Sequence, residues 1–231
     1  VVASMIVTLL LRDDDTDRFH NKLAVDALDV FSSLTHPKLH EQITSTENLV
    51  NGLQRVLSQG SGDGRRVAAQ VVRDLARNHV VNQSLFGETE GLLRSLITLI
   101  RSGRAEISKK AGAEALQVLV ANHADNKKAA ASAGAIAPLI DLLNLRRSDA
   151  TIRAALTALK HLALGSKSNI ETIANSGAIA ALITVVRSGK EDITRRDAAN
   201  TLNILTVEST QNVKLIAKSG AEAVDALLRM L

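Results

Sequence analysis

The chain has 231 residues, of which 45% are hydrophobic and 23% charged, which is enough to bury a core and too apolar for a disordered segment. The absence of cysteine excludes disulfides, thiolate metal sites and cysteine nucleophiles, and the near absence of aromatic residues requires an aliphatic core. The formal net charge of +4 tolerates acidic partners without requiring them, and no apolar run reaches the ~18 residues of a membrane helix, so we expect no membrane insertion.

The chain begins with an apolar segment, Val1–Leu11, which lacks the basic flank of a signal peptide. Its Leu10 opens a column of leucines spaced 43 residues apart, which continues through Leu53, Leu96, Leu139 and Leu182. A fixed period of about 40–47 residues is typical of α-helical repeat arrays. We therefore expect a single array over residues 1–231, with repeat boundaries near residues 5, 48, 91, 134, 177 and 220. Because the chain starts and stops inside apolar helices, we expect about five repeats truncated at both ends.

Two early segments contain residue types found in chemical sites. His36 and His40 lie four residues apart beside Glu41, but Pro37 disfavours the helix that would bring the histidines together, so we expect no metal site. The glycine-rich segment Gly60–Arg65 lacks the Lys-Ser/Thr pair of a phosphate-binding loop. We interpret it as a flexible turn between two helices.

The clearest repeat predicts three successive helices. A short helix, Asn169–Gly177, ends in a glycine whose left-handed conformation turns the chain. A second helix, Ala178–Val186, is apolar on nearly every side and is expected to be buried between its neighbours. A longer amphipathic helix, about Ile193–Val207, closes the repeat.

Other repeats share this pattern. Asn126–Gly134 and Asn212–Gly220 predict further short helices that open with asparagine, whereas Gly87–Gly91 departs from the pattern and predicts an irregular turn. The long helices share an apolar pair three residues apart, which we expect in the core: Leu28/Phe31, Val72/Leu75, Leu116/Leu119, Leu159/Leu162 and Leu202/Leu205.

These strings carry a resemblance to a known family. Ala133–Leu143 and Ser176–Val186 share a Gly-Ala-Ile-Ala start followed by aliphatic residues, and Arg153–Leu159 approximates the pattern Arg-x-Ala-Ala-x-x-Ala-Leu. In them the chain resembles the armadillo repeat family, over nearly its whole length. The resemblance implies an all-α, right-handed superhelical solenoid that binds other proteins through its concave face. The spacing and the turn Arg187–Gly189 are most similar to plant-type armadillo proteins, including those that carry a U-box ubiquitin-ligase domain elsewhere.

The chain departs from one branch of that family, the importin-α group that carries nuclear import cargo. Members of that group resemble each other in a ladder of asparagines, with a tryptophan four residues before each. The matching asparagine positions here are Val30, Asp74, Val118, His161 and Ile204. The matching tryptophan positions are Asp26, Gln70, Glu114, Thr157 and Asn200. None has the required side chain, which counts against binding of nuclear signals.

One position on the expected long helices, which line the concave face of such arrays, is always basic. We name it the basic column: Lys22, Arg66, Lys110, Arg153 and Arg196. Because arginine bonds carboxylates through two parallel hydrogen bonds, the basic column predicts an extended or helical acidic partner. The remaining expected contact residues are Gln70, Asp74, Glu114, Thr157, His161 and Asn200. Alternatively, the basic column is a solvated rim or pairs with acidic neighbours such as Glu106, Asp149 or Asp192.

The sequence therefore predicts a protein–protein interaction scaffold rather than an enzyme, with no cofactor and no metal. Nucleic acid is disfavoured as a partner, because three phenylalanines cannot supply the stacking platform that single strands need. Two alternatives stay open: the substrate-recruiting arm of a ubiquitin ligase whose catalytic domain lies outside the chain, and a nuclear transport adaptor, which the missing asparagine ladder disfavours. We expect a cytoplasmic or nuclear location.

Overall fold

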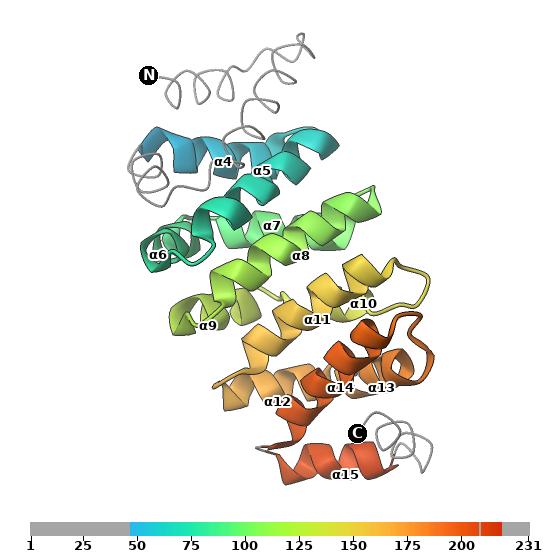
Figure 1. Cartoon of the computed structure of the whole chain (residues 1–231). Helices are drawn as coiled ribbons and strands as arrows, with labels where there is room; N and C mark the ends of the chain where they lie inside the picture. The colour runs from blue at the N-terminus through green and yellow to red at the C-terminus, as the bar shows by residue number, and fades with distance from the viewer. Residues whose placement is uncertain (1–46, 208, 219–231) are drawn as a thin grey trace. The chain divides into compact units, whose positions relative to one another are not determined.

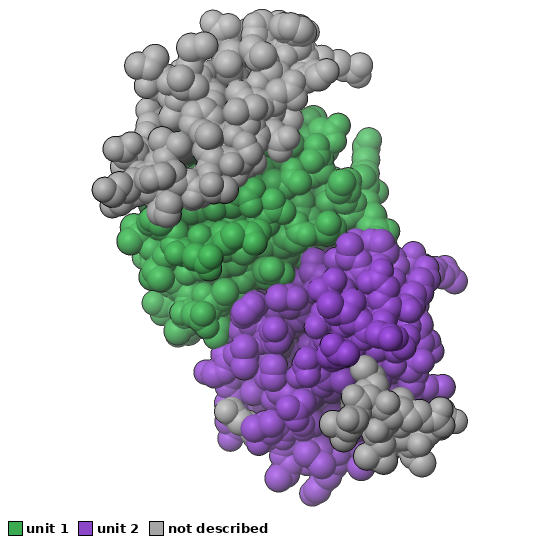
Figure 2. All heavy atoms as spheres, in the orientation of Figure 1, with its two compact units in different colours: residues 1–133 green, residues 134–231 purple. Residues whose placement is uncertain are grey.

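The computed structural model describes residues 47–207 and 209–218. Within these ranges the chain forms twelve α-helices and no strand, as the expected all-α fold requires. The chain divides into two compact units, residues 1–133 and 134–231 (Figure 2), whose boundary falls at an expected repeat boundary. The sequence-based expectations for Lys22, for His36 and His40, and for the first leucine of the column lie outside the described residues.

Unit 1 contains two layers of helices. Its described helices are α4 (Glu47–Gln59), α5 (Gly62–Ala76), α6 (Val80–Glu88), α7 (Leu92–Ser102), α8 (Glu106–Val120) and α9 (Ala124–Ser132). The long helices α5 and α8 pack side by side, and the apolar helices α4 and α7 form a second layer behind them (Figure 1). The short helices α6 and α9 each follow a long helix and pack against each other.

Unit 2 repeats this arrangement. Its described helices are α10 (Ile136–Asp141), α11 (Asp149–Ala163), α12 (Lys167–Asn175), α13 (Ala178–Ser188), α14 (Asp192–Val207) and α15 (Thr210–Lys218). The long helices α11 and α14 pack side by side, and α13 packs against α14. The bounds of α12, α13 and α14 lie within two residues of the three helices that the sequence predicts. Taken singly, none of the described helices is long and apolar enough to span a bilayer; only the bent pair α12–α13 passes that test jointly.

The periodic leucines form the core, as predicted. Leu53, Leu96, Leu139 and Leu182 are all fully buried, each at the centre of its apolar helix. The four described apolar pairs of the long helices are at most 1% exposed. Burial of these aliphatic side chains away from water stabilises the folded protein by roughly 1.5–3 kcal/mol for each leucine.

Left-handed residues separate the helices. Gly91, Gly134 and Gly177 have φ of 76°, 82° and 85°, which confirms the predicted turn between each short helix and the next apolar helix. A second left-handed position, which the sequence did not reveal, follows the long helices α5, α8 and α11. It is occupied by Asn78, Asn122 and Gly165, with φ of 57°, 55° and 71°.

The predicted turn at Gly60–Arg65 is wrong in extent. Helix α5 already begins at Gly62, and the Oγ of Ser61 accepts a hydrogen bond from the backbone N–H of Gly64 at 3.1 Å. This N-cap draws the residues after Ser61 into the first helical turn. The segment is therefore a short, capped connection rather than a flexible loop.

Two other predictions need correction. Helix α13 is not buried on every side, because Ala180 and Thr184 are exposed. Its exposed side carries small residues, so the apolar composition of the helix did not indicate which side faces solvent. The predicted irregular turn at Gly87–Gly91 is also wrong in part. Helix α6 extends to Glu88, and Gly91 adopts the same left-handed conformation as its counterparts.

Candidate functional site

The exposed stripe of the long helices contains the predicted contact residues. In unit 1 we name it the unit-1 face; it comprises Arg66, Gln70, Arg73 and Asp74 of α5, Arg77 directly after α5, and Lys110, Glu114 and Gln117 of α8. Arg66 donates from Nη1 to Oε1 of Gln70 at 2.9 Å, and its Nε lies 3.6 Å from Oδ1 of Asp63. The first described member of the basic column is therefore already engaged within its own helix.

An ion cluster joins α5 to α8 on the unit-1 face. Arg73 donates from Nε to Oδ1 of Asp74 and from Nη1 to Oε2 of Glu114, both at 2.7 Å, and Nζ of Lys110 lies 3.4 Å from the other Glu114 oxygen. The hydrogen bond to Asp74 raises the pKa of Arg73 most, and the charges of Asp74 and Glu114 add to it, against the lowering by burial. Three of the predicted contact residues, Asp74, Lys110 and Glu114, thus belong to one charge-compensated cluster.

Unit 2 has a more open stripe, which we name the unit-2 face. It comprises Arg153, Thr157, Lys160 and His161 of α11, Leu164 directly after α11, and Arg196, Asn200, Asn203, Ile204 and Val207 of α14. Arg153 donates from Nε to Oδ2 of Asp197 at 3.1 Å, which is a half-exposed pair linking α11 to α14. Arg196 is exposed and has neither an ion pair nor a hydrogen bond to any described residue.

The basic residues just before the basic column have a structural role. Arg65 donates from Nε to the carbonyl of Gly60 at 2.9 Å, Lys109 from Nζ to that of Arg101 at 2.8 Å, and Arg195 from Nη1 to that of Gly189 at 2.8 Å. Each cation thereby satisfies a carbonyl at the C-terminal end of the preceding apolar helix, where the helix dipole favours positive charge. These side chains stabilise the helix ends within each repeat.

Two of the acids that the sequence suggested as partners of the basic column, Asp149 and Asp192, have other partners. Asp192 pairs with Arg195, and Oδ1 of Asp149 accepts from the backbone N–H of Glu191 at 3.3 Å. The carboxylates that contact the column are Asp63, Glu114 and Asp197. All three lie on the long helices themselves, Asp63 three residues before its partner, Glu114 one turn after its partner and Asp197 on the neighbouring helix.

Buried asparagines form a second column, whose role the sequence did not reveal. We name Asn82, Asn126, Asn169 and Asn212 the asparagine column; they are at most 5% exposed. Each donates from Nδ2 to the backbone carbonyl seven residues earlier, at the end of the preceding long helix, at 2.7–2.9 Å. Asn126 also donates to the carbonyl of Gln83 in the repeat before it, at 2.8 Å. The recurring asparagine was visible in the sequence, but its bond depends on the turn between the two helices.

The other predicted contact residues also lie on the long helices. Gln70 contacts Arg66, Thr157 donates to the carbonyl of Arg153, and His161 is half-buried on α11. Within the described ranges no three histidines, aspartates or glutamates converge as metal ligands. Two further residues of these faces, Arg73 and Lys160, were not predicted; they follow Arg66 and Arg153 by seven residues and therefore lie on the same side of their helices.

Helix triplets with a common core and a row of exposed side chains on the long helices define an α-helical repeat scaffold. Residues 123–164, which include α9, α10 and α11, match the model of the Armadillo/beta-catenin-like repeat. The chain contains an armadillo repeat, and its structure has the armadillo-repeat fold. The resemblance seen in the sequence is thereby confirmed at the level of the fold.

Solved structures agree with this assignment. The chain is similar to an engineered protein, at 20% identity and a TM-score of 0.84 over 99% of this chain and 98% of that one. It is similar to a designed armadillo repeat protein in complex with the peptide (KR)4, at 18% identity and a TM-score of 0.70 over 96% and 98% of the two chains. It is also similar to ARO, the armadillo-repeats-only protein of Plasmodium falciparum, at 18% identity and a TM-score of 0.75 over 88% and 92%. No curated protein matches the chain in sequence.

Proposed function

We propose that the chain is a protein-recognition scaffold that binds a segment of another protein on the long helices of its repeats, and that the segment bound by unit 2 is acidic. The observation that carries the proposal is Arg196, which is exposed on α14 with no partner among the described residues. Arg153 occupies the equivalent position on the adjoining α11 and is itself half-exposed. Two guanidinium groups on neighbouring helices can each receive a carboxylate through two parallel hydrogen bonds.

The contrast between the two faces supports the choice of unit 2. On the unit-1 face, Arg73 and Lys110 already share Glu114, and Arg66 is bonded to Gln70. An incoming carboxylate there would compete with bonds that the fold has already formed. The unit-2 face has Arg153, Lys160 and Arg196, and among the described residues only Asp197 contacts its basic column with a carboxylate. It can therefore accept negative charge without first giving up several internal bonds.

The fold is suited to this use because each repeat contributes one long helix with side chains at fixed positions. One structural neighbour, the designed protein in complex with (KR)4, holds a basic peptide. For the present chain we propose a bound segment of the opposite charge, that is, an acidic one. Exposed ion pairs contribute about 0–1 kcal/mol each, so affinity depends on several contacts along the segment.

Of the two narrower functions that the sequence left open, the proposal includes one. Substrate recruitment for a ubiquitin ligase would use this same face, with the chemistry supplied by another domain. A nuclear transport adaptor is not proposed, because Asp74 and Val118 stand where that group has asparagines, the first in an ion cluster and the second buried. We propose a non-catalytic role in the cytoplasm or nucleus.

Charge reversal on the unit-2 face tests the proposal. Partners would be recovered by pull-down and mass spectrometry with the unaltered chain, with Arg153→Glu/Arg196→Glu, and with a control of equal charge change, Lys167→Glu/Lys190→Glu, at exposed positions outside the face. We expect the first pair to lose the partners and the control to keep them, with thermal unfolding unchanged in both. Partner sets that are identical for the two variants would overturn the proposal.

A further inference from the structure

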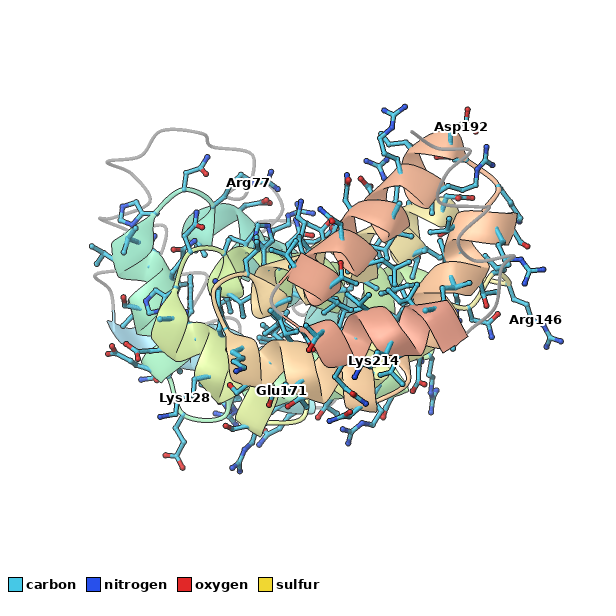
Figure 3. All side chains as sticks on the ribbon, turned by 90° about the horizontal axis from the view of Figure 1, so that it is seen from below. Arg77, Lys128, Arg146, Glu171, Asp192 and Lys214 are labelled. Atoms are coloured by element: carbon cyan, nitrogen blue, oxygen red, sulfur yellow. The ribbon has the colours of Figure 1, made fainter. Side chains whose placement is uncertain are left out.

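The unit-2 face changes character along its length. Leu164 follows Arg153 by eleven residues, and Val207 follows Arg196 by eleven, so both lie three helical turns further along the same side. Leu164 is 39% exposed and Val207 is 72% exposed. In Figure 3, Asp192 lies at the upper end of α14, and Glu171 of α12 lies on the lower side of the view. One end of the face is therefore cationic and the other apolar.

Equivalent positions show that this pattern belongs to unit 2. The residues that correspond to Leu164 and Val207 in unit 1 are Arg77 and Ala121, one charged and one small. A single exposed aliphatic residue needs no explanation. Two at the same position of adjoining helices, on the stripe that contains the exposed arginines, form a surface with two chemical parts. The half-buried Ile204 of α14 extends its apolar part.

We infer that unit 2 recognises a segment that combines an acidic residue with a large aliphatic residue, the acid over Arg153 and Arg196 and the aliphatic side chain over Leu164 and Val207. The inference rests on the proposed function and names its partner more closely. The acidic end lies toward the N-termini of α11 and α14, which the helix dipole also favours. The aliphatic end removes from water the apolar surface that the free protein leaves exposed.

The spacing of the two parts follows from helix geometry. Eleven residues at about 1.5 Å each separate the two parts by roughly 16 Å along the helix axis. An extended segment advances about 3.3 Å per residue, so its acidic and aliphatic residues should stand about five residues apart. This spacing distinguishes the inference from a general attraction between opposite charges.

A random library of twelve-residue peptides displayed on phage, selected on the full chain, tests the inference. We expect enriched peptides to contain Asp or Glu about five residues from Leu, Ile, Val or Phe. Fluorescence anisotropy with the most enriched peptide then compares Leu164→Ser and Val207→Ser with the control Val213→Ser, which alters an aliphatic residue that is 50% exposed on α15. Each of the first two changes should weaken binding about tenfold, and the control should not.

The outcomes separate this inference from the proposed function. If the enriched peptides are acidic without an aliphatic residue, or bind Leu164→Ser and Val207→Ser normally while Arg153→Glu/Arg196→Glu abolishes binding, the inference is overturned and the proposed function stands. If no selected peptide loses affinity for Arg153→Glu/Arg196→Glu, both are overturned. Thermal unfolding of each variant confirms that the differences do not reflect loss of the fold.

Discussion

Gly87 of α6 lies so close to Asn126 of α9 that a Cβ atom on Gly87 would stand 1.8 Å from the Asn126 Oδ1. The carboxamide of Asn126 has little freedom to move away, because its Nδ2 donates to the carbonyls of both Leu119 and Gln83 at 2.8 Å. Neighbouring short helices of unit 1 therefore approach each other only because position 87 has no side chain. The glycine is a packing requirement rather than a turn residue, which is why its position inside α6 was not predicted.

Gly87→Ala should consequently destabilise the protein. A methyl group there must displace a buried, hydrogen-bonded side chain, and overpacking of this kind costs about 1–3 kcal/mol. Urea denaturation followed by circular dichroism would measure the loss. Gly62→Ala is the matched control, because a Cβ at Gly62 in the first turn of α5 has no atom within 4 Å; we expect it to be neutral or slightly stabilising. Equal stability of the two variants would contradict this account of Gly87.

Substitutions in the asparagine column should lower the stability of the fold by different amounts. Asn169→Ala removes the side-chain donor to the carbonyl of Leu162, whereas Asn126→Ala removes donors to two carbonyls. Leaving a buried carbonyl unsatisfied costs about 1–3 kcal/mol, so Asn126→Ala should be the more damaging change. Asn175→Ala, at an exposed position near the end of α12, is the control. The role assigned to the column fails if chemical denaturation places Asn169→Ala and Asn175→Ala at the same stability.

The sequence predicted the parts of the fold that repeat. Two features recur every 43 residues: the buried leucines, and the left-handed glycines Gly91, Gly134 and Gly177. In such a pattern leucine indicates a buried position and glycine indicates a turn. The left-handed Asn78 and Asn122 were not predicted, because asparagine also occurs widely on exposed surfaces. The orientation of α13 was missed for a related reason, since alanine is compatible with both a buried and an exposed side of a helix.

The sequence predicted which helices carry the residues of the candidate site, but not which hydrogen bonds and ion pairs these residues form. The period placed Arg66, Lys110, Arg153 and Arg196 on the long helices, where the structure has them. Which of them are engaged depends on contacts between repeats, such as Arg73 with Glu114, 41 residues apart, and Arg153 with Asp197, 44 residues apart. Those contacts arise from the packing of adjoining helices and from side-chain rotamers, and neither follows from a one-dimensional period.

The ion cluster of unit 1 should stabilise the contact between α5 and α8. Arg73→Met removes the bonds to Asp74 and Glu114, whose side chains are about one-fifth exposed, and should cost about 1–2 kcal/mol. A double-mutant cycle with Glu114→Gln should give a coupling energy near ~1 kcal/mol that decreases with added salt. A coupling energy of zero at low salt would show that the pair is only a surface contact.

The pH dependence of this contribution has a definite sign. The pKa of Arg73 is raised in the folded protein, so its stabilising effect is fully present below the ordinary arginine pKa and is lost only above it. The difference in unfolding free energy between the unaltered chain and Arg73→Met should therefore stay constant from neutral pH to about pH 10. A difference that shrinks over this range would mean that another titrating group controls the contact.

One substitution at two equivalent positions should have opposite effects. Thr194 in the first turn of α14 is fully buried, and its Oγ1 has no hydrogen-bond partner among the residues that the structure describes. Thr151, one repeat earlier in α11, is equally buried, but its Oγ1 lies 2.9 Å from the Oγ of Ser148. Valine has nearly the shape of threonine without the hydroxyl group. Thr194→Val should raise the free energy of unfolding by about 1 kcal/mol, because it removes an unsatisfied buried polar group.

Thr151→Val should lower the free energy of unfolding by a similar ~1 kcal/mol, because it breaks a satisfied bond at the N-cap of α11. Parallel urea titrations of the two variants and the unaltered chain measure both effects under the same conditions. Because the substitution, the burial and the place in the repeat are the same, only the hydrogen bond distinguishes the two sites. Changes of the same sign would show that the hydroxyl of Thr194 is satisfied in solution.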